Sequence, residues 1–183
     1  MKKRSMLFHF SAYGFLKNQR YFEPFFLLFF LSWGLSYTQA GLLFGFRELC
    51  INLLEIPSGA VADFFGRKRS MILSFSLYIV SFSLFGSAGS SFMVLFLAMF
   101  FFSAAETFRT GTHKAIIFSW LRLNSRIHEK TKVYGFTRSW SKIGSAVSIV
   151  IATVLMLLTR NYGAIFYSSI IPYLLGMVNF LFY

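Results

Sequence analysis

Six long apolar runs constrain this chain more than any other feature of its sequence. They lie at about residues 16–35, 41–63, 70–88, 92–120, 138–158 and 164–183. Each is close to the roughly 20 residues that an α-helix needs to cross the hydrocarbon core of a bilayer. The pattern predicts an all-α membrane protein with six transmembrane helices.

The amino-acid composition favours the same class. Of the 183 residues, 56% are hydrophobic and only 13% are charged, whereas a soluble domain carries about 25% charged residues. The abundance of apolar residues excludes a disordered chain. The single cysteine, Cys50, excludes an internal disulfide framework and a cysteine-based zinc or iron–sulfur site. We therefore expect no metal and no cofactor.

The positions of the basic residues decide what the net charge means, which is +12 from 18 Lys and Arg against 6 Asp and Glu. In a soluble protein this balance indicates nucleic acid binding, whereas in a membrane protein it indicates basic cytoplasmic loops. Most of the cations lie in the segments 2–20, 67–69 and 122–142, and the alternate turns carry only Arg160. This alternation favours a multi-pass membrane protein with both termini in the cytoplasm and no nucleic acid partner.

The first residues of the chain imitate a signal peptide, because a charged segment precedes an apolar one. No small-residue cleavage site follows, since residues 17–20 are Lys, Asn, Gln and Arg. We therefore expect residues 1–15 to form a basic cytoplasmic arm and residues 16–183 to form the helical bundle.

Ionisable side chains inside the expected helices are the candidates for function, because each costs about 2.5–3.5 kcal/mol to insert into a bilayer. The spacing of Glu106, Arg109 and His113 places these three on one helix face. The full set of candidates is Glu23, Arg47, Glu48, Glu106, Arg109 and His113.

Two interpretations of these groups remain open. In the first, several helices direct them into a common polar cavity that binds a solute or moves protons. In the second, they are structural ion pairs that hold helices together, and the spacing of Glu106 and Arg109 suits such a pair. Glu23 precedes Pro24, which also suits a simple kink.

An ordered motif joins the second expected helix to the third. It consists of Gly59, three residues, Asp63, two residues, Gly66, Arg67 and Lys68. Glycine at the first position allows close backbone approach, and the aspartate can face the positive N-terminus of a neighbouring helix. The second glycine favours a tight turn, and the two cations can anchor that turn at lipid headgroups.

This spacing resembles the signature between the second and third helices of the major facilitator superfamily, a large family of secondary transporters. Two departures are Phe64, where the family often has arginine, and Ser119, near the place where an acid often pairs with residue 67. The likeness extends from about Lys17 onward, through the further segments 22–25, 36–39, 55–59, 106–115 and 134–140.

The resemblance implies a fold of twelve helices in two six-helix bundles, each made of two inverted three-helix repeats. In such a fold the substrate binds between the bundles, and rocking of one bundle against the other alternates access. The residues of the motif would act as a conformational gate, with Asp63 contacting the second bundle. The chain would supply the N-terminal bundle.

The chain reaches only the end of the sixth expected helix. The resemblance therefore implies that a second bundle comes from elsewhere. Our leading expectation is a fragment of a longer transporter. A separately encoded second half and a homodimer are the alternatives.

Among function classes, we expect a transporter rather than an enzyme. Asp63 is the only aspartate, whereas metal-dependent headgroup transferases need several, and no phosphate-binding glycine loop is present. The expected function is secondary active transport of a small solute, coupled to an ion or to protons through Glu48 or Glu106. The alternative is a non-transporting membrane scaffold or sensor built on the same bundle. The charged groups suit polar or zwitterionic solutes, whereas the 26 phenylalanines suit apolar ones.

Overall fold

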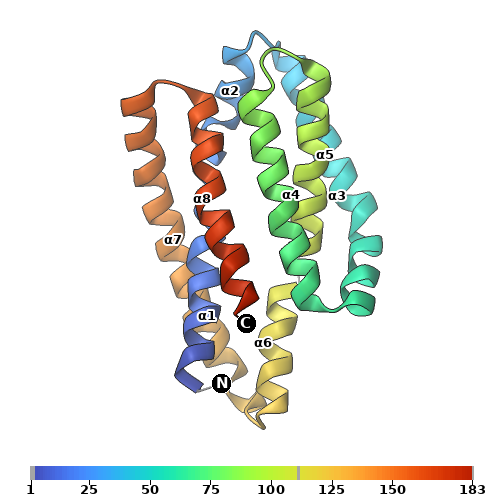
Figure 1. Ribbon diagram of the computed structural model, residues 1–183, viewed down its shortest axis with the longest axis vertical. Helices are drawn as coiled ribbons and strands as arrows, with labels where there is room; N and C mark the ends of the chain where they lie inside the picture. Colours follow the sequence, from blue (N-terminus) through green and yellow to red (C-terminus); the bar gives the residue numbers. More distant parts are fainter. Residues whose placement is uncertain (1–2, 111, 183) are drawn as a thin grey trace.

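The computed structural model describes residues 3–110 and 112–182, and every regular element in those ranges is a helix. Met1 and Lys2 of the expected arm, Gly111, and Tyr183 at the end of the last expected helix lie outside the described residues. The elements are α1 (Lys3–Leu16), η1 (Glu23–Phe25), α2 (Phe26–Ser32), α3 (Tyr37–Phe65), α4 (Arg67–Ser87), α5 (Phe92–Arg109), α6 (Thr112–Leu123), η2 (Ile127–Glu129), α7 (Lys130–Thr159) and α8 (Tyr162–Leu181) (Figure 1).

Four helical segments of the described chain are long and apolar enough, by length and composition, to cross a membrane. They are Arg67–Ser87, Phe92–Leu123, Ile127–Thr159 and Tyr162–Leu181. Helix α3 has the length, at 29 residues, but carries Arg47, Glu48, Glu55 and Asp63. Helices α1 and α2 are apolar but short, at 14 and 7 residues. The structure therefore supports an all-helical membrane protein.

The boundaries predicted for the first helix, 16–35, are wrong. Helix α1 ends at Leu16, and η1 begins only at Glu23. The intervening polar side chains bond to backbone carbonyls, because Asn18 Nδ2 donates to Gly14 O at 2.7 Å and Gln19 Nε2 donates to Gly144 O at 3.1 Å. Such bonds stabilise a break in the helix. The described part of the expected arm is thus helix α1, with Phe10 and Tyr13 buried.

Two further boundaries differ from prediction. The helix expected at 92–120 is divided into α5 and α6, because Thr110 adopts an extended conformation with φ −63° and ψ 131°. The loop expected at 121–137 is short, since α7 begins at Lys130. The side chain of Val133 packs there with Phe10, Ile117 and Leu121, and burial of these apolar groups supports the extra turns.

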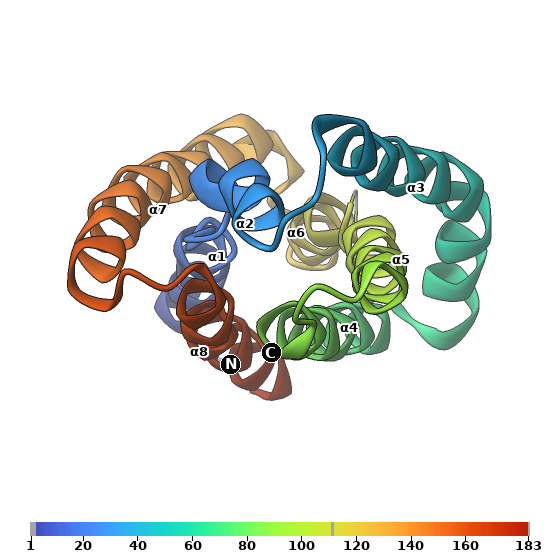
Figure 2. The ribbon, with the colours of Figure 1, turned by 90° about the horizontal axis from the view of Figure 1, so that it is seen from above.

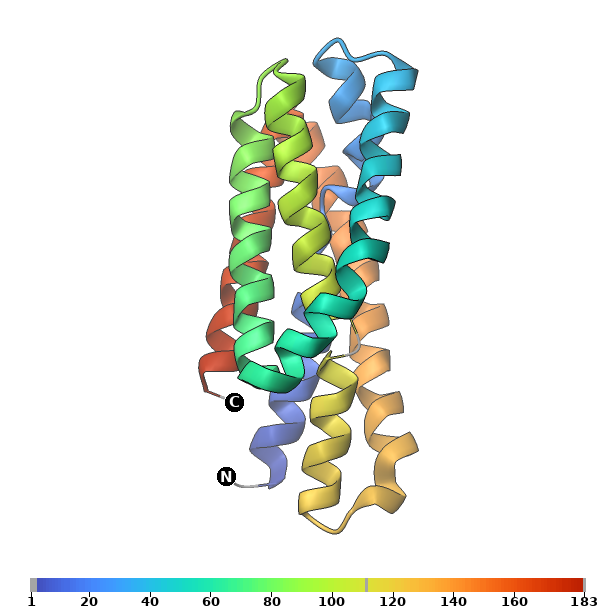
Figure 3. The same ribbon diagram turned by 90° about the vertical axis from the view of Figure 1, so that its right-hand side faces the viewer.

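Phenylalanine rings form the core of the bundle. The ring of Phe26 lies 5.2 Å from Phe85 and 5.4 Å from Phe166, so one side chain of α2 meets both α4 and α8. Helix α4 packs between α5 and α8. Seen along the helix axes, α3 and α7 lie on opposite outer sides of the bundle (Figure 2). Helix α6 and the first turns of α7 extend past the turn that joins α3 to α4 (Figure 3).

Small side chains bring the helices into close contact. On α4, Ser74 Oγ donates to Ala105 O at 2.6 Å and Ser81 Oγ donates to Ala98 O at 2.9 Å, both on α5. A Cβ at Gly144 would lie only 2.6 Å from Phe15 O, so α1 and α7 touch at this glycine. Small residues and hydroxyls of this kind are typical of interfaces between membrane helices.

Candidate functional site

A largely buried ion pair lies where α4 and α5 pack together. Arg109 and Glu106 of α5 form a salt bridge, and their side chains are 16% and 19% exposed. From α4, the Tyr78 hydroxyl donates to Glu106 Oε2 and accepts from Arg109 Nε, the latter at 3.2 Å. The charge of Arg109 is therefore balanced inside the bundle.

Aromatic side chains from two more helices enclose this network. The rings of Tyr13 on α1 and His113 on α6 lie 3.8 Å apart, and both residues are buried. The Tyr13 hydroxyl interacts with Arg109. The structure thus places Tyr13 against both Arg109 and His113, but the break at Thr110 puts His113 on α6 rather than on the single helix face that the spacing predicted. The participation of Tyr78 and Tyr13 gave no sequence signal, because both lie in largely apolar helices.

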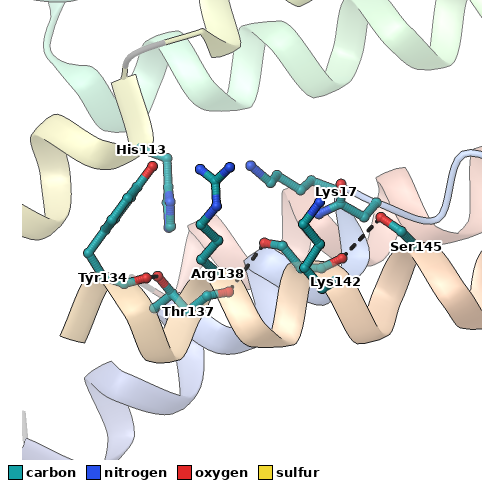
Figure 4. Close-up of a pocket in the computed structure, with 9 residues that line it drawn as sticks. Lys17, His113, Tyr134, Thr137, Arg138, Lys142 and Ser145 are labelled. Atoms are coloured by element: carbon teal, nitrogen blue, oxygen red, sulfur yellow. Dashed lines mark hydrogen bonds between the residues drawn. The ribbon is translucent and has the colours of Figure 1, made fainter. Parts of the chain in front are cut away.

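A polar cavity of about 210 Å³ opens beside His113. Its lining comes from α6, α7 and the break after α1, and it includes Lys17, Arg138 and Lys142. Figure 4 shows Arg138 and Lys142 rising from α7 toward the Lys17 side chain. The sequence predicts these cations in the basic segments on the cytoplasmic side. The available signal was that Arg138 and Lys142 lie one helical turn apart at the start of an apolar run.

A second cavity of about 440 Å³ shares Asn18 and Ser145 with the first. Arg20 and Glu23 line it, and they form a salt bridge of 3.3 Å. The structure therefore places Glu23 at a cavity wall, with its charge balanced by Arg20.

The remaining candidates, Arg47 and Glu48, pair with each other on α3. Arg47 Nε donates to Glu48 Oε1 at 2.9 Å, and the Glu48 side chain is 56% exposed. The contacts described for this pair do not join it to Glu106 or Arg109. Glu48 is thus exposed on α3 and has no described contact with Glu106, and a cavity shared by the two acids stays a prediction.

The motif between α3 and α4 forms a tight turn. Gly66 has φ +92°, a conformation that side chains rarely adopt, so glycine is required there. Gly59 and Asp63 are exposed on the last turns of α3, and nothing lies within 4 Å of a Cβ built on Gly59.

The two cations of the motif donate hydrogen bonds to neighbouring helices, in addition to any contact with lipid headgroups. Arg67 Nη1 donates to Ser119 Oγ at 2.6 Å and to Ala115 O at 3.2 Å, both on α6. Lys68 Nζ donates to Leu181 O at 3.0 Å on α8. Ser119, which stands near the place where the family often has an acid, therefore still accepts a hydrogen bond from Arg67.

We expect substitution of Arg67 by glutamine to lower the free energy of unfolding by about 1.5–3 kcal/mol, the range for hydrogen bonds to charged groups. The buried thiol of Cys50 provides the measurement, since a maleimide dye reacts with it as the bundle unfolds in a denaturing detergent. Arg69→Gln, at an exposed position two residues away, should change stability by less than about 0.5 kcal/mol. The double variant Arg67→Gln with Ser119→Ala tests the contact itself. If the two losses in free energy of unfolding were fully additive, the hydrogen bond between these side chains would contribute nothing.

The sequence profile of the Major Facilitator Superfamily matches residues 7–183. The chain belongs to this superfamily. An uncharacterized transporter of the same superfamily, YxaM of Bacillus subtilis (strain 168), is 29% identical over 91 residues. That match covers 50% of this chain and 23% of YxaM, so the chain spans well under two thirds of the relative's length.

Membership of the major facilitator superfamily places the structural features described above in a membrane protein. The chain is an integral, multi-pass membrane protein of a transporter family, and its apolar outer surface is in contact with lipid. The turn with Gly66 and Arg67 lies within the residues that the superfamily profile matches. The largely buried ion pair and the two cavities then belong to a bundle of membrane helices.

Proposed function

We propose that this chain forms the amino-terminal half of a secondary active transporter that moves a small solute by alternating access. The observation that supports this most directly is the largely buried Glu106–Arg109 pair, in a bundle that also holds two cavities lined by charged side chains. Ionisable groups inside a membrane protein are costly and usually belong to a solute or proton pathway. Family membership favours transport over the scaffold or sensor alternative.

In this proposal the bundle contains six membrane-spanning units. Helix α3 is about 44 Å long at 1.5 Å per residue, which exceeds the bilayer core of about 30 Å. Helices α1 and α2 lie toward opposite ends of the bundle, so together they cross its height (Figure 1). A broken helix is tolerated in a membrane where its free backbone lines a cavity. Lys17, Asn18 and Arg20 of this break do line the two cavities.

The orientation follows from the ends of the helices. The start of α1, the turn between α3 and α4 and the turn between α6 and α7 lie at one end of the bundle, and the turn between α7 and α8, which contains Arg160, lies at the other (Figure 1). We place the end with most cations in the cytoplasm of a bacterial cell.

Coupling to protons is proposed for Glu106 rather than Glu48. Glu106 is largely buried and hydrogen-bonded, so a change in its protonation alters the network with Tyr78 and Arg109. Glu48 forms an exposed pair, and exposed pairs contribute little energy.

Alternating access requires a second bundle. We propose that the exposed turns around Gly59 and Asp63 form the gate against it. The second bundle comes from the remainder of a longer protein, from a separately encoded chain, or from a second copy. Sequencing of the source DNA beyond codon 183 distinguishes the first case from the others.

The test of transport uses proteoliposomes that contain the chain alone or together with the segment encoded after codon 183. Labelled succinate, phosphate, alanine and choline are offered under an imposed pH gradient, with a pH-sensitive dye inside the vesicles. We expect uptake of at least one solute together with proton movement. Glu106→Gln should lose gradient-driven uptake and keep solute exchange, whereas Glu48→Gln should keep both. Gradient-driven uptake that survives both substitutions contradicts proton coupling. Normal insertion without uptake or solute-dependent stabilisation favours the scaffold.

A further inference from the structure

The cavity beside His113 is strongly cationic. Three basic side chains line it, Lys17, Arg138 and Lys142, and the lining residues of this cavity in the described chain include no carboxylate (Figure 4). Lys17 also interacts electrostatically with Arg109 and Arg138. Like charges held together repel one another, so an anion between them would be bound favourably.

The nearest acids already have cationic partners. Glu106 pairs with Arg109 and accepts from Tyr78, although it also attracts Lys17. Glu23, in the adjoining cavity, pairs with Arg20. Neither acid offsets the three cations of the first cavity, because each is opposed by its own arginine.

The hydroxyl groups of the cavity add no further charge and few free donors. Thr137, Ser141 and Ser145 donate to carbonyls of their own helix at 2.8, 3.2 and 3.1 Å (Figure 4). The strongest hydrogen-bond donors that remain are therefore ammonium and guanidinium groups. These groups prefer carboxylate and phosphate oxygens.

The cavity lies deeper than the basic turn at the end of the bundle. Arg67, at the start of α4, reaches Ser119 on α6. His113 precedes Ser119 by six residues on the same helix, which is about 9 Å along its axis. Lys17 is half-buried there with its ammonium 5.5 Å from the centre of the Tyr13 ring, whereas Arg138 and Lys142 are exposed side chains of α7.

We propose that this cavity is a binding site for a small anion that carries carboxylate or phosphate groups, held by Lys17, Arg138 and Lys142. The inference deepens the proposed function by naming its substrate class, and it rests on that function only for the transport of the anion. Asn18 and Ser145 are shared with the second cavity, so a larger anion extends toward Arg20. An anionic lipid headgroup has the same chemistry as a free phosphate, and the test below separates the two.

The test measures the electrostatic potential inside the cavity with a single reporter thiol. Cys50 is the only cysteine, so Cys50→Ser gives a cysteine-free chain, and Ser145→Cys places one thiol in the cavity wall. Purified protein in nanodiscs of neutral lipid is treated with an anionic or a cationic methanethiosulfonate reagent. We expect the ratio of the anionic to the cationic rate to exceed that of a free thiol by about 10-fold or more, because charged clefts concentrate opposite charges to this degree.

Two double variants of equal charge provide the control. Arg138→Gln with Lys142→Gln should lower the ratio about 10-fold, since both cations line the cavity. Arg122→Gln with Lys132→Gln removes the same charge from two exposed positions that do not line the cavity, and it should change the ratio less than about 2-fold, because salt screens charges outside the cavity. Equal effects of the two doubles, a ratio like that of a free thiol, or no reaction with either reagent would each overturn the proposal.

Protection experiments identify the source of the anion. Slower modification in the presence of phosphate or succinate, in neutral lipid, supports a free solute. Protection only when the nanodisc contains phosphatidylglycerol supports a lipid headgroup. Protection in neither case overturns the binding site. If the cavity selects anions while no solute is taken up by proteoliposomes, the transport proposal fails and this inference stands. If the proteoliposomes take up alanine or choline while the cavity shows no preference for anions, the transport proposal stands and this inference fails.

Discussion

Substitution of Glu106 by glutamine is expected to lower the free energy of unfolding by about 3–5 kcal/mol. The change removes the counterion of Arg109 while that guanidinium stays inside the bundle, where only 16% of its side chain is exposed. A buried charge without a partner is far more costly than the loss of the pair itself. Dye reaction with the buried Cys50 thiol during unfolding in detergent measures the effect.

Two matched variants test the cause. Glu48→Gln breaks an ion pair with the same chemistry on the open face of α3, and it should cost less than about 1 kcal/mol. Glu106→Gln combined with Arg109→Gln removes both charges and should recover most of the lost stability. A double variant no more stable than Glu106→Gln alone would show that the cost comes from lost packing and not from the unpaired charge.

Gly144→Ala is expected to destabilise the bundle by about 1–3 kcal/mol, the usual cost of overpacking. A Cβ at this position would lie 2.6 Å from Phe15 O and 3.1 Å from Phe15 Cα, and backbone atoms cannot rotate away. Helix α1 must then move away from α7. Because Lys17 follows α1 directly and Lys142 lies on α7, the same change should widen the cationic cavity and reduce its preference for the anionic thiol reagent.

Gly135→Ala is the control on the same helix, since nothing lies within 4 Å of a Cβ built there. Alanine is favoured over glycine in a helix by up to about 1 kcal/mol, so this variant should be neutral or slightly stabilising. Equal stability of the Gly144 and Gly135 variants would mean that α1 and α7 do not approach each other as closely as described.

Much of the architecture could be predicted from residue patterns. The apolar runs and the basic turns predicted an all-helical membrane protein, and the Gly59-to-Lys68 spacing predicted the superfamily that the profile matches. The spacing of Glu106 and Arg109 predicted their pairing. These features depend on hydropathy, charge and helical periodicity, which are local properties of a chain.

The helix breaks were less accessible to such reasoning. The run of apolar residues favours one continuous helix over 16–35. The observed break instead depends on the hydrogen bond from Gln19 to Gly144 O, which lies 125 residues further along the chain. The boundary between α5 and α6 likewise depends on the backbone conformation of Thr110. Polar side chains that bond to a distant backbone leave no periodic pattern in the sequence.

By itself the sequence determined the class of protein, the family and the ion pair within α5, because each follows from residues close together along the chain. Only the tertiary structure decided that Tyr78 joins this pair, that Arg67 reaches Ser119, and that Glu48 stays apart. It also decided that Lys17 meets Arg138 and Lys142. The reason is physical: helices that are apolar all round carry little information about which face meets which neighbour, and close contacts such as that at Gly144 settle the choice.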